Sequence, residues 1–372
     1  MKYSIVMLLL VAACSGSHGP QPAEPPRIEK PETVRVLWSA NVGGAERFTF
    51  FPAPTGDAVY AAARDGTVTR LDAATGAVRW RVPLELRLSG GVGAEELVAV
   101  ASEEGEVVAL DAETGKVRWR ARVSSEVLAP PAVGGGLVLV RSIDNRVFAL
   151  GAEDGKRRWL YQRAPTSLLV RAPAAITIAG ELAFAGFPGG KLAAIALANG
   201  ALRWEATVTA AKGTTELERV SDVIGRPAAQ GREVCAAAYR GRVACYDAAS
   251  GRQLWARELA SLSGVTLDAR YAFVADERGA VHALDRTNGQ SVWKQDKLAH
   301  RSLSAPFPGG NAIAVGDFEG YVHFLARDTG DFVARYATGG GAVRAAPVPL
   351  IFEAITGLLV QTESGGLFAL AL

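Results

Sequence analysis

One motif recurs along this chain and restricts its fold more than any other feature. Seven times an apolar stretch leads into a turn that ends in glycine, typically D-A-x-T-G, and in six copies a Trp follows four residues later. The turn glycines are Gly76, Gly115, Gly155, Gly200, Gly251, Gly289 and Gly330. They are spaced by 39, 40, 45, 51, 38 and 41 residues. Self-similarity at a period of about 40 residues indicates a repeat architecture, in which each repeat is one supersecondary unit.

Each repeat predicts four short antiparallel strands. In residues 129–159 the stretch APPAVGGG precedes an apolar run, LVLVRS, and then come a polar turn, an alternating strand and a strand that carries Trp159. Glycine in the turn permits a positive φ, and the preceding Asp or Asn can accept hydrogen bonds from its own backbone. No segment shows a sustained helical period. Four antiparallel strands in about 40 residues are typical of a propeller blade.

The two ends of the chain set the number of blades. The C-terminal stretch SGGLFALAL (364–372) lacks a following turn and Trp, whereas RVLWSANV (35–42) has a Trp strand with nothing before it. Seven motifs and one blade shared between the ends predict an all-β fold, an eight-bladed β-propeller of four-stranded antiparallel blades over residues 33–372. The N-terminal strand with Trp38 should join the C-terminal blade and close the ring, because closure removes exposed sheet edges.

The Trp and Cys residues allow two further predictions. A Trp at a fixed place in each blade should pack between neighbouring blades, with its N–H available to a backbone carbonyl. Cys235 and Cys245 flank Arg240-Gly241, which we interpret as a two-residue hairpin turn. That register places Cys235 opposite Tyr246, with the two Cys on opposite sheet faces, and therefore predicts no disulfide between them.

The N-terminus predicts export and lipidation. Residues 1–13, MKYSIVMLLLVAA, have the charge, the apolar run and the small residues of a secretory signal, and they are too short to span a bilayer. Val11-Ala12-Ala13-Cys14 resembles a bacterial lipobox, so Cys14 is the expected lipidation site; an ordinary signal peptide with an incidental Cys is the alternative. Residues 14–32 are rich in Pro, Gly, Ser and charge and should form a flexible tether. By resemblance to Gram-negative lipoproteins, Ser15 after the Cys implies the outer membrane.

Evidence for catalysis or nucleic-acid binding is weak. The formal net charge of +2 gives no basic field for nucleic acid, and no nucleophile elbow, P-loop or zinc-protease motif occurs. His282 and His323 occupy equivalent places in neighbouring repeats, but no third ligand is evident; we interpret them as polar side chains at a blade surface. We expect no metal and no cofactor.

The repeat itself resembles the one named for pyrroloquinoline quinone enzymes. This resemblance leaves open a periplasmic quinoprotein dehydrogenase, although such an enzyme should also have an adjacent Cys pair, which this chain lacks. A ligand-binding propeller module is the other alternative.

The two longest spacings mark candidate binding loops, because a rigid ring holds its loops in place. The first loop spans 163–175 and the second 212–227. Leu168 and Val170 are two residues apart and would project to one side of an extended loop. Arg171 supplies a forked donor for a carboxylate or carbonyls, and Asp222 could accept hydrogen bonds from a partner or brace Arg171. Alternatively, the two apolar residues belong to the core and Arg171 pairs internally with Asp222.

Several motifs together resemble the BamB family, the lipoprotein subunits of the β-barrel assembly machinery of the Gram-negative outer membrane. The motifs are the lipobox, the eight repeats, SLLVR (167–171), GTTELERVSDV (213–223), LAHRSLSAP (298–306) and DFEGYVH (317–323). The resemblance implies a non-enzymatic scaffold on the periplasmic face of the outer membrane. Such a scaffold binds the POTRA domains of BamA and assists insertion of β-barrel proteins. Unfolded outer-membrane proteins could also add a strand to a blade edge, which ring closure disfavours.

The same resemblance implies the contact residues. They are Leu168, Val170, Arg171 and Asp222, with Val170 in place of a more usual Leu. Ile224 stands where the family commonly has a second Asp, so one acidic contact is missing and the interface should depend more on apolar area.

Overall fold

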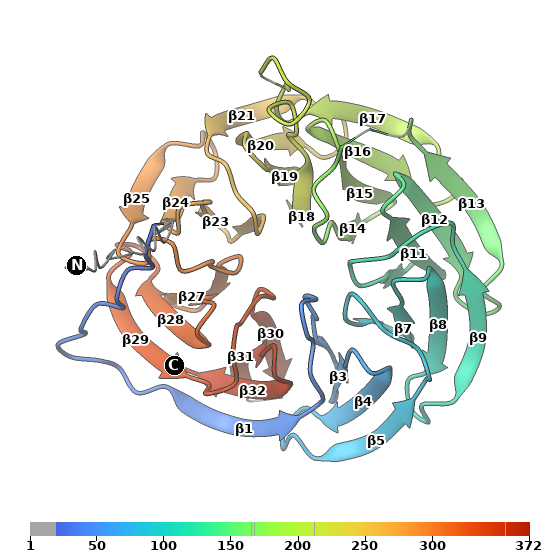
Figure 1. The fold of residues 1–372 in the computed structure, drawn as a ribbon, viewed down its shortest axis with the longest axis horizontal. Helices are drawn as coiled ribbons and strands as arrows, with labels where there is room; N and C mark the ends of the chain where they lie inside the picture. The colour runs from blue at the N-terminus through green and yellow to red at the C-terminus, as the bar shows by residue number, and fades with distance from the viewer. Residues whose placement is uncertain (1–19, 165, 167, 212, 354) are drawn as a thin grey trace, which may run out of the picture.

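The predicted ring of blades is confirmed. The computed structural model describes residues 20–164, 166, 168–211, 213–353 and 355–372. Within these residues 32 strands form eight four-stranded antiparallel sheets, arranged as blades around a central axis (Figure 1). The expected signal peptide at 1–13 and the expected lipidation site Cys14 lie outside the described residues. In the part of the chain that is described, no helix is long and apolar enough to cross a membrane.

The strands of each blade are given in order from the innermost to the outermost. Blades one to four comprise β2 (Ala53–Thr55), β3 (Ala58–Ala62), β4 (Thr67–Asp72) and β5 (Val78–Pro83); β6 (Gly93–Ala94), β7 (Leu97–Ala101), β8 (Glu106–Asp111) and β9 (Val117–Arg122); β10 (Ala132–Gly134), β11 (Leu137–Ser142), β12 (Arg146–Gly151) and β13 (Arg157–Gln162); and β14 (Ile176–Ala179), β15 (Leu182–Phe187), β16 (Lys191–Ala196) and β17 (Leu202–Thr207). Blades five to eight comprise β18 (Val223–Gln230), β19 (Glu233–Ala238), β20 (Arg242–Asp247) and β21 (Gln253–Glu258); β22 (Val265–Leu267), β23 (Tyr271–Ala275), β24 (Val281–Asp285) and β25 (Ser291–Gln295); β26 (Phe307–Gly309), β27 (Ala312–Gly316), β28 (Tyr321–Ala326) and β29 (Phe332–Ala337); and β30 (Val348–Phe352), β31 (Ile355–Gln361), β32 (Gly366–Ala371) and β1 (Arg35–Asn41).

The core lies between the blades. The second strand of a blade is typically buried along its whole length, as in β7, because both of its faces pack on neighbouring blades. One such interface joins Leu97 and Trp119 of blade two to Val138 and Val140 of blade three. Small and branched apolar side chains fit the narrow space between stacked sheets. Because such a strand is buried on both faces, its sequence is a continuous apolar run and does not alternate between apolar and polar residues.

The Trp residues connect successive blades, as predicted. Trp80 of blade one donates its indole N–H to the carbonyl of Ala112 in blade two at 3.1 Å. The next blade's turn glycine, Gly115, has a φ of 70° and lies against this ring, and a Cβ there would come within 2.9 Å of it. Six more Trp donate in the same way to the following blade, at 2.7–2.9 Å: Trp38, Trp119, Trp159, Trp204, Trp255 and Trp293. The turn glycine therefore meets two demands, a left-handed backbone and room for the indole.

Ring closure also explains the one motif that lacks its Trp. Ala334 takes the Trp position in blade seven and is fully buried. In blade eight the outer two strands are β32 and β1, which come from opposite ends of the chain. No turn joins them, so no turn glycine is present to receive an indole from blade seven. The smaller alanine occupies that place instead.

The N-terminal strand completes blade eight as predicted. β1 pairs with β32 from Arg35 opposite Ala371 to Asn41 opposite Gly366. Trp38 donates to the carbonyl of Ala73 at 2.9 Å and so links blade eight to blade one.

Residues preceding β1 also contact the ring, beside blade seven. The Ala23 N–H donates to Ala299 at 2.9 Å, the Ala23 carbonyl accepts from Arg301 at 2.9 Å, and the Glu32 N–H donates to Val333 at 2.8 Å. These contacts involve the described part of the expected tether. The division of the chain at residues 13 and 32 stays a prediction.

The prediction of no disulfide was wrong. Cys235 and Cys245 lie directly opposite each other on β19 and β20 and form a disulfide. The connecting loop has three residues, 239–241, which shifts the register by one. Arg240 supplies the left-handed conformation, with a φ of 47°. Gly241 is required for space, because a Cβ there would lie 2.6 Å from Thr209; the sequence interpretation had assigned Gly241 to the turn geometry.

His282 and His323, which occupy equivalent positions in neighbouring repeats, were both predicted to lie at a blade surface, and this prediction was wrong for His323. Its side chain is fully buried, and its Nε2 lies 2.9 Å from a carboxylate oxygen of Asp317. His282 makes the same contact with Asp276 in blade six at 2.9 Å. Each carboxylate belongs to the turn just before the strand that carries the histidine. Within the described ranges, no three His, Cys, Asp or Glu side chains are grouped to hold a metal ion.

Candidate partner-binding surface

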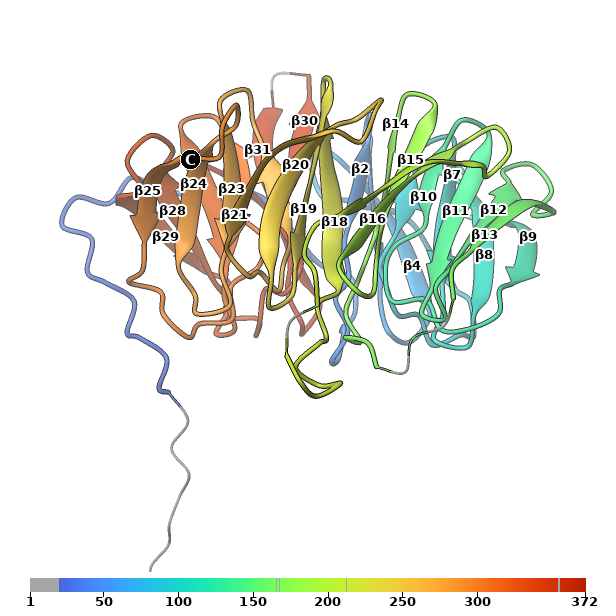
Figure 2. The same cartoon turned by 90° about the horizontal axis from the view of Figure 1, so that it is seen from above.

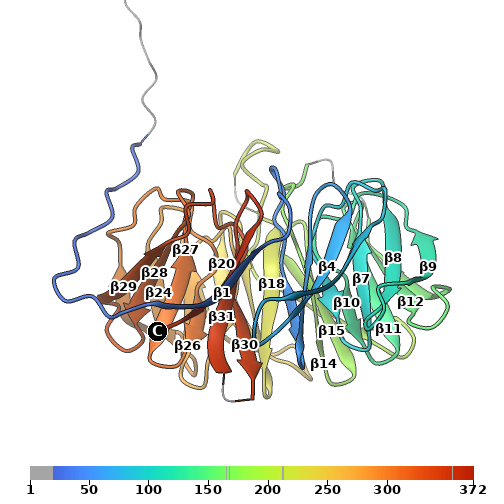
Figure 3. The ribbon, with the colours of Figure 1, turned by 90° about the horizontal axis from the view of Figure 1, so that it is seen from below.

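The two long loops project from the same face of the ring. The blade 3–4 loop (163–175) joins β13 to β14, and the blade 4–5 loop (208–222) joins β17 to β18. In the two side views (Figures 2 and 3) both extend beyond the strand ends on one side. The described end of the N-terminal segment reaches the same side. We call this side the long-loop face.

The blade 4–5 loop is folded by its own side chains. Thr215 and Glu218 form a reciprocal pair: the Glu218 carboxylate accepts the Thr215 N–H at 3.1 Å, and the Thr215 hydroxyl accepts the Glu218 N–H at 3.2 Å. This is the arrangement of a helix-capping box, although here it closes a short turn. The N–H groups of Thr215 and Thr214 lower the pKa of Glu218. The turn presents Leu217, whose side chain is 66% exposed.

Asp222 connects the two loops from within. It is 4% exposed, and its carboxylate accepts the Val170 N–H at 2.6 Å and the Gly189 N–H at 3.2 Å. Burial raises its pKa, and the two N–H donors oppose that effect. Neither hydrogen bond involves Arg171, so the internal Arg171–Asp222 pair considered as an alternative does not form. Asp222 fixes the backbone of the blade 3–4 loop.

Leu168 and Val170 lie in different surroundings. Leu168 is 45% exposed, whereas Val170 is half-buried and lines a hollow together with Leu169. The expectation that both project to one side assumed an extended chain. Val170 is instead held inward by its own N–H, which donates to Asp222 at 2.6 Å. The Ala172 N–H donates to the Val170 carbonyl at 2.9 Å and turns the chain at Arg171.

Arg171 is held by a carboxylate of this chain. Its Nε lies 3.0 Å from Glu126, and a second guanidinium nitrogen also contacts that carboxylate. Glu126 raises the pKa of Arg171. The guanidinium also lies over the Phe48 ring, 5.6 Å from its centroid. These contacts fix the direction of a side chain that is still 45% exposed.

Ile224 does not add exposed apolar area. It lies on β18, is 3% exposed and lines the same hollow as Val170. The next residue, Gly225, adopts a φ of 72° and bonds the neighbouring loop: its N–H donates to Pro173 at 2.9 Å. The pairing of β18 with β19 shifts at this point. Ile224 itself is therefore not part of the exposed surface, and the greater dependence of the interface on apolar area stays a prediction.

The chain is similar in sequence to known proteins over nearly its whole length. The family model described as "Outer membrane protein assembly factor BamB" matches residues 30–89 and 64–295. The chain belongs to the BamB family. It is 44% identical to the BamB of Bordetella pertussis over 348 residues, which cover 93% of this chain and 89% of that protein. It is 42% identical to the BamB of Burkholderia pseudomallei over 364 residues, 97% of this chain and 94% of that protein.

Solved structures support the same fold. The crystal structure of BamB from Moraxella catarrhalis has a TM-score of 0.83 at 27% identity and covers 91% of this chain and 100% of that chain. A quinohemoprotein alcohol dehydrogenase from Comamonas testosteroni has a TM-score of 0.74 at 13% identity, covering 91% of this chain and 76% of the enzyme. At that identity the likeness shows a shared propeller fold alone.

Sequence reasoning missed three residues of this BamB-family surface. Leu217 lies between the polar residues of the capping turn, and its apolar character was the available signal. Glu126 lies in the loop between β9 and β10, and Phe48 lies in the loop between β1 and β2. No local sequence pattern links either residue to Arg171. Only the ring brings these segments together.

Proposed function

We propose that this BamB-family chain is a non-enzymatic assembly factor for outer-membrane β-barrel proteins, and that it docks on the POTRA domains of BamA through its long-loop face. The similarity to BamB proteins along nearly the whole chain supports the assembly role. The family consists of assembly factors, so we do not retain the dehydrogenase alternative.

The contact site is proposed on the geometry of one loop. Leu168 offers exposed apolar area, and Arg171 beside it offers a pre-oriented guanidinium. Anchors of this kind, held rigid before binding, commonly dominate interface energetics. Val170 and Asp222 support the contact site indirectly, because the Asp222 carboxylate accepts the Val170 N–H and so holds the loop backbone in place. Leu217 extends the same face.

The double variant Leu168→Ala/Arg171→Ala tests this site. We expect its affinity for the purified POTRA domains of BamA from the same organism to fall at least about 30-fold, which corresponds to the roughly 2 kcal/mol that defines a hot spot. Calorimetric titration gives the dissociation constant, and circular dichroism melting checks the fold.

A matched control exists on the outer rim of the ring. Leu202→Ala/Arg203→Ala removes an adjacent Leu-Arg pair from β17, where Leu202 is 46% exposed. This variant should bind like the wild type. Equal affinities for both double variants would refute docking through the blade 3–4 loop.

Attachment to the membrane is proposed through Cys14, as the lipobox resemblance implies. A multiply acylated N-terminal Cys anchors a folded domain without a spanning helix. We expect Cys14→Ser to move the protein from the outer-membrane fraction to the soluble periplasmic fraction. Immunoblotting of separated fractions measures this, and unchanged outer-membrane recovery of Cys14→Ser would contradict it.

A further inference from the structure

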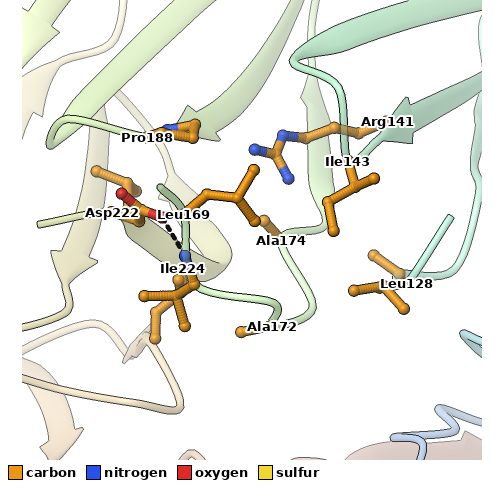
Figure 4. Close-up of a pocket in the computed structure, with 12 residues that line it drawn as sticks. Leu128, Arg141, Ile143, Leu169, Ala172, Ala174, Pro188, Asp222 and Ile224 are labelled. Carbon is orange, nitrogen blue, oxygen red and sulfur yellow. Dashed lines mark hydrogen bonds between the residues drawn. The ribbon is translucent and has the colours of Figure 1, made fainter. Parts of the chain in front are cut away.

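Arg141 points into a hollow between the two long loops. The hollow lies between the β11–β12 turn, the blade 3–4 loop and the start of β18, and it is lined by Leu128, Ile143, Leu169, Pro188 and Ile224 among others. Arg141 extends into it from the end of β11, and Asp222 lies across from it (Figure 4). The lining is apolar apart from these two charged side chains.

The Arg141 guanidinium has no carboxylate bound to it. Its Nε is buried without a hydrogen-bond partner, and among the described residues no ion pair within 4 Å includes it. Its specific contact is the Phe187 ring, whose centroid is 5.2 Å away. Burial lowers the pKa of Arg141 to about 10, while Asp222 and Asp144 oppose that effect. The group therefore carries its full charge at neutral pH.

The nearby carboxylates are already engaged. Asp222 accepts two backbone N–H groups. Asp144 accepts from Ser124 at 2.7 Å and pairs with Arg146 at 2.7 Å. Arg141 is half-buried, and a partly desolvated guanidinium without a hydrogen-bonded anion costs the free protein some stability. A carboxylate that entered the hollow would offset that cost.

We infer that Arg141 receives an aspartate or glutamate side chain of the protein that docks on the long-loop face. The inference rests on the proposed function, and it adds a second binding position, distinct from Arg171. Arg171 already has Glu126 as its partner, whereas Arg141 has an unfilled forked donor that matches a carboxylate. The apolar lining suits the methylene stem of an acidic residue, and a docked partner would cover the hollow and shield the ion pair from water, which strengthens it.

Charge removal at Arg141 tests the inference. Arg141→Met keeps the length and apolar stem of the side chain, and its affinity for the POTRA domains of BamA should fall at least about 30-fold, as for a desolvated ion pair that loses one partner. Its melting temperature should stay the same or rise, because a half-buried charge without an ion-pair partner is gone. Arg141→Lys should recover part of the affinity. Arg158→Gln, an exposed arginine of the same blade paired with Asp154, is the control and should bind normally.

The partner's residue can then be found by a double-mutant cycle. Each Asp and Glu of the POTRA surface is changed in turn to its amide. The change at the residue that pairs with Arg141 should weaken binding to the wild type but should not weaken binding to Arg141→Met any further. Normal binding of Arg141→Met, while Leu168→Ala/Arg171→Ala binds weakly, would overturn this inference and leave the proposed function standing. Loss of affinity together with a lower melting temperature would also overturn it, since Arg141 would then be structural. If the wild type does not bind the POTRA domains, both proposals fail.

Discussion

Removing residues 33–42 is expected to destabilise the entire ring, and this is the largest effect that we predict. The deletion takes away β1, whose backbone pairs along β32, and Trp38, which links blade eight to blade one. Loss of a buried Trp alone typically costs about 3–5 kcal/mol. The deletion should cost more, because it also exposes β32 as an unpaired edge.

The comparison should use chains 33–372 and 43–372, both without the tether. Urea unfolding followed by Trp fluorescence gives the free energy of unfolding, and Trp38→Ala in the longer chain separates the indole from the strand. A synthetic peptide of residues 33–42 should restore part of the lost stability by strand addition. Equal unfolding midpoints for the two chains would contradict closure by β1.

Asp317→Asn should produce the second large loss of stability. The Asp317 carboxylate is fully buried and accepts from Arg301 at 2.7 Å, from His323 at 2.9 Å and from the Tyr321 N–H at 2.9 Å. Arg301 is also buried, and it donates to the Ala23 carbonyl of the N-terminal segment. Removing the Asp317 charge leaves the buried Arg301 with only the half-exposed carboxylate of Glu319 as an ion-pair partner, and breaking a buried pair in this way costs on the order of 3 kcal/mol.

The effect should depend on pH. Burial raises the pKa of Asp317, but the hydrogen bond and charge of His323 and the other donors outweigh burial, so its pKa is lowered. A carboxylate with a depressed pKa stabilises the fold above its unfolded-state value of about 4 and loses that contribution as the pH falls. The difference between wild type and Asp317→Asn should therefore be largest near neutral pH and shrink below about pH 4.

Blade six offers the matched control for this variant. Asp276 bonds His282 in the same way and accepts the equivalent turn N–H groups. Among the residues that the structure describes, no arginine side chain pairs with it. Asp276→Asn should cost only about 1–2 kcal/mol, as for a hydrogen-bonded group near the surface. Chemical denaturation at pH 7 and pH 3.5 measures both variants. A similar loss for the two would refute the special contribution of the Arg301 pair.

The sequence alone determined the blades and their closure. The spacing of the turn glycines, the Trp four residues on and the incomplete motifs at 35–42 and 364–372 are local patterns that repeat, and repetition made each of them readable. A propeller places consecutive strands side by side, so its main contacts are near neighbours in the chain.

The tertiary structure decided the hairpin register at 239–241 and the partners of the site residues. Gly241 was misread because the need for space came from Thr209, in the preceding blade 4–5 loop. Arg171 pairs with Glu126, and Asp222 accepts the Val170 N–H, whereas the buried Nε of Arg141 has no hydrogen-bond partner among the residues that the structure describes. Each outcome depends on which inter-blade loops the ring brings together, and contacts between loops of different blades leave no periodic trace in the sequence.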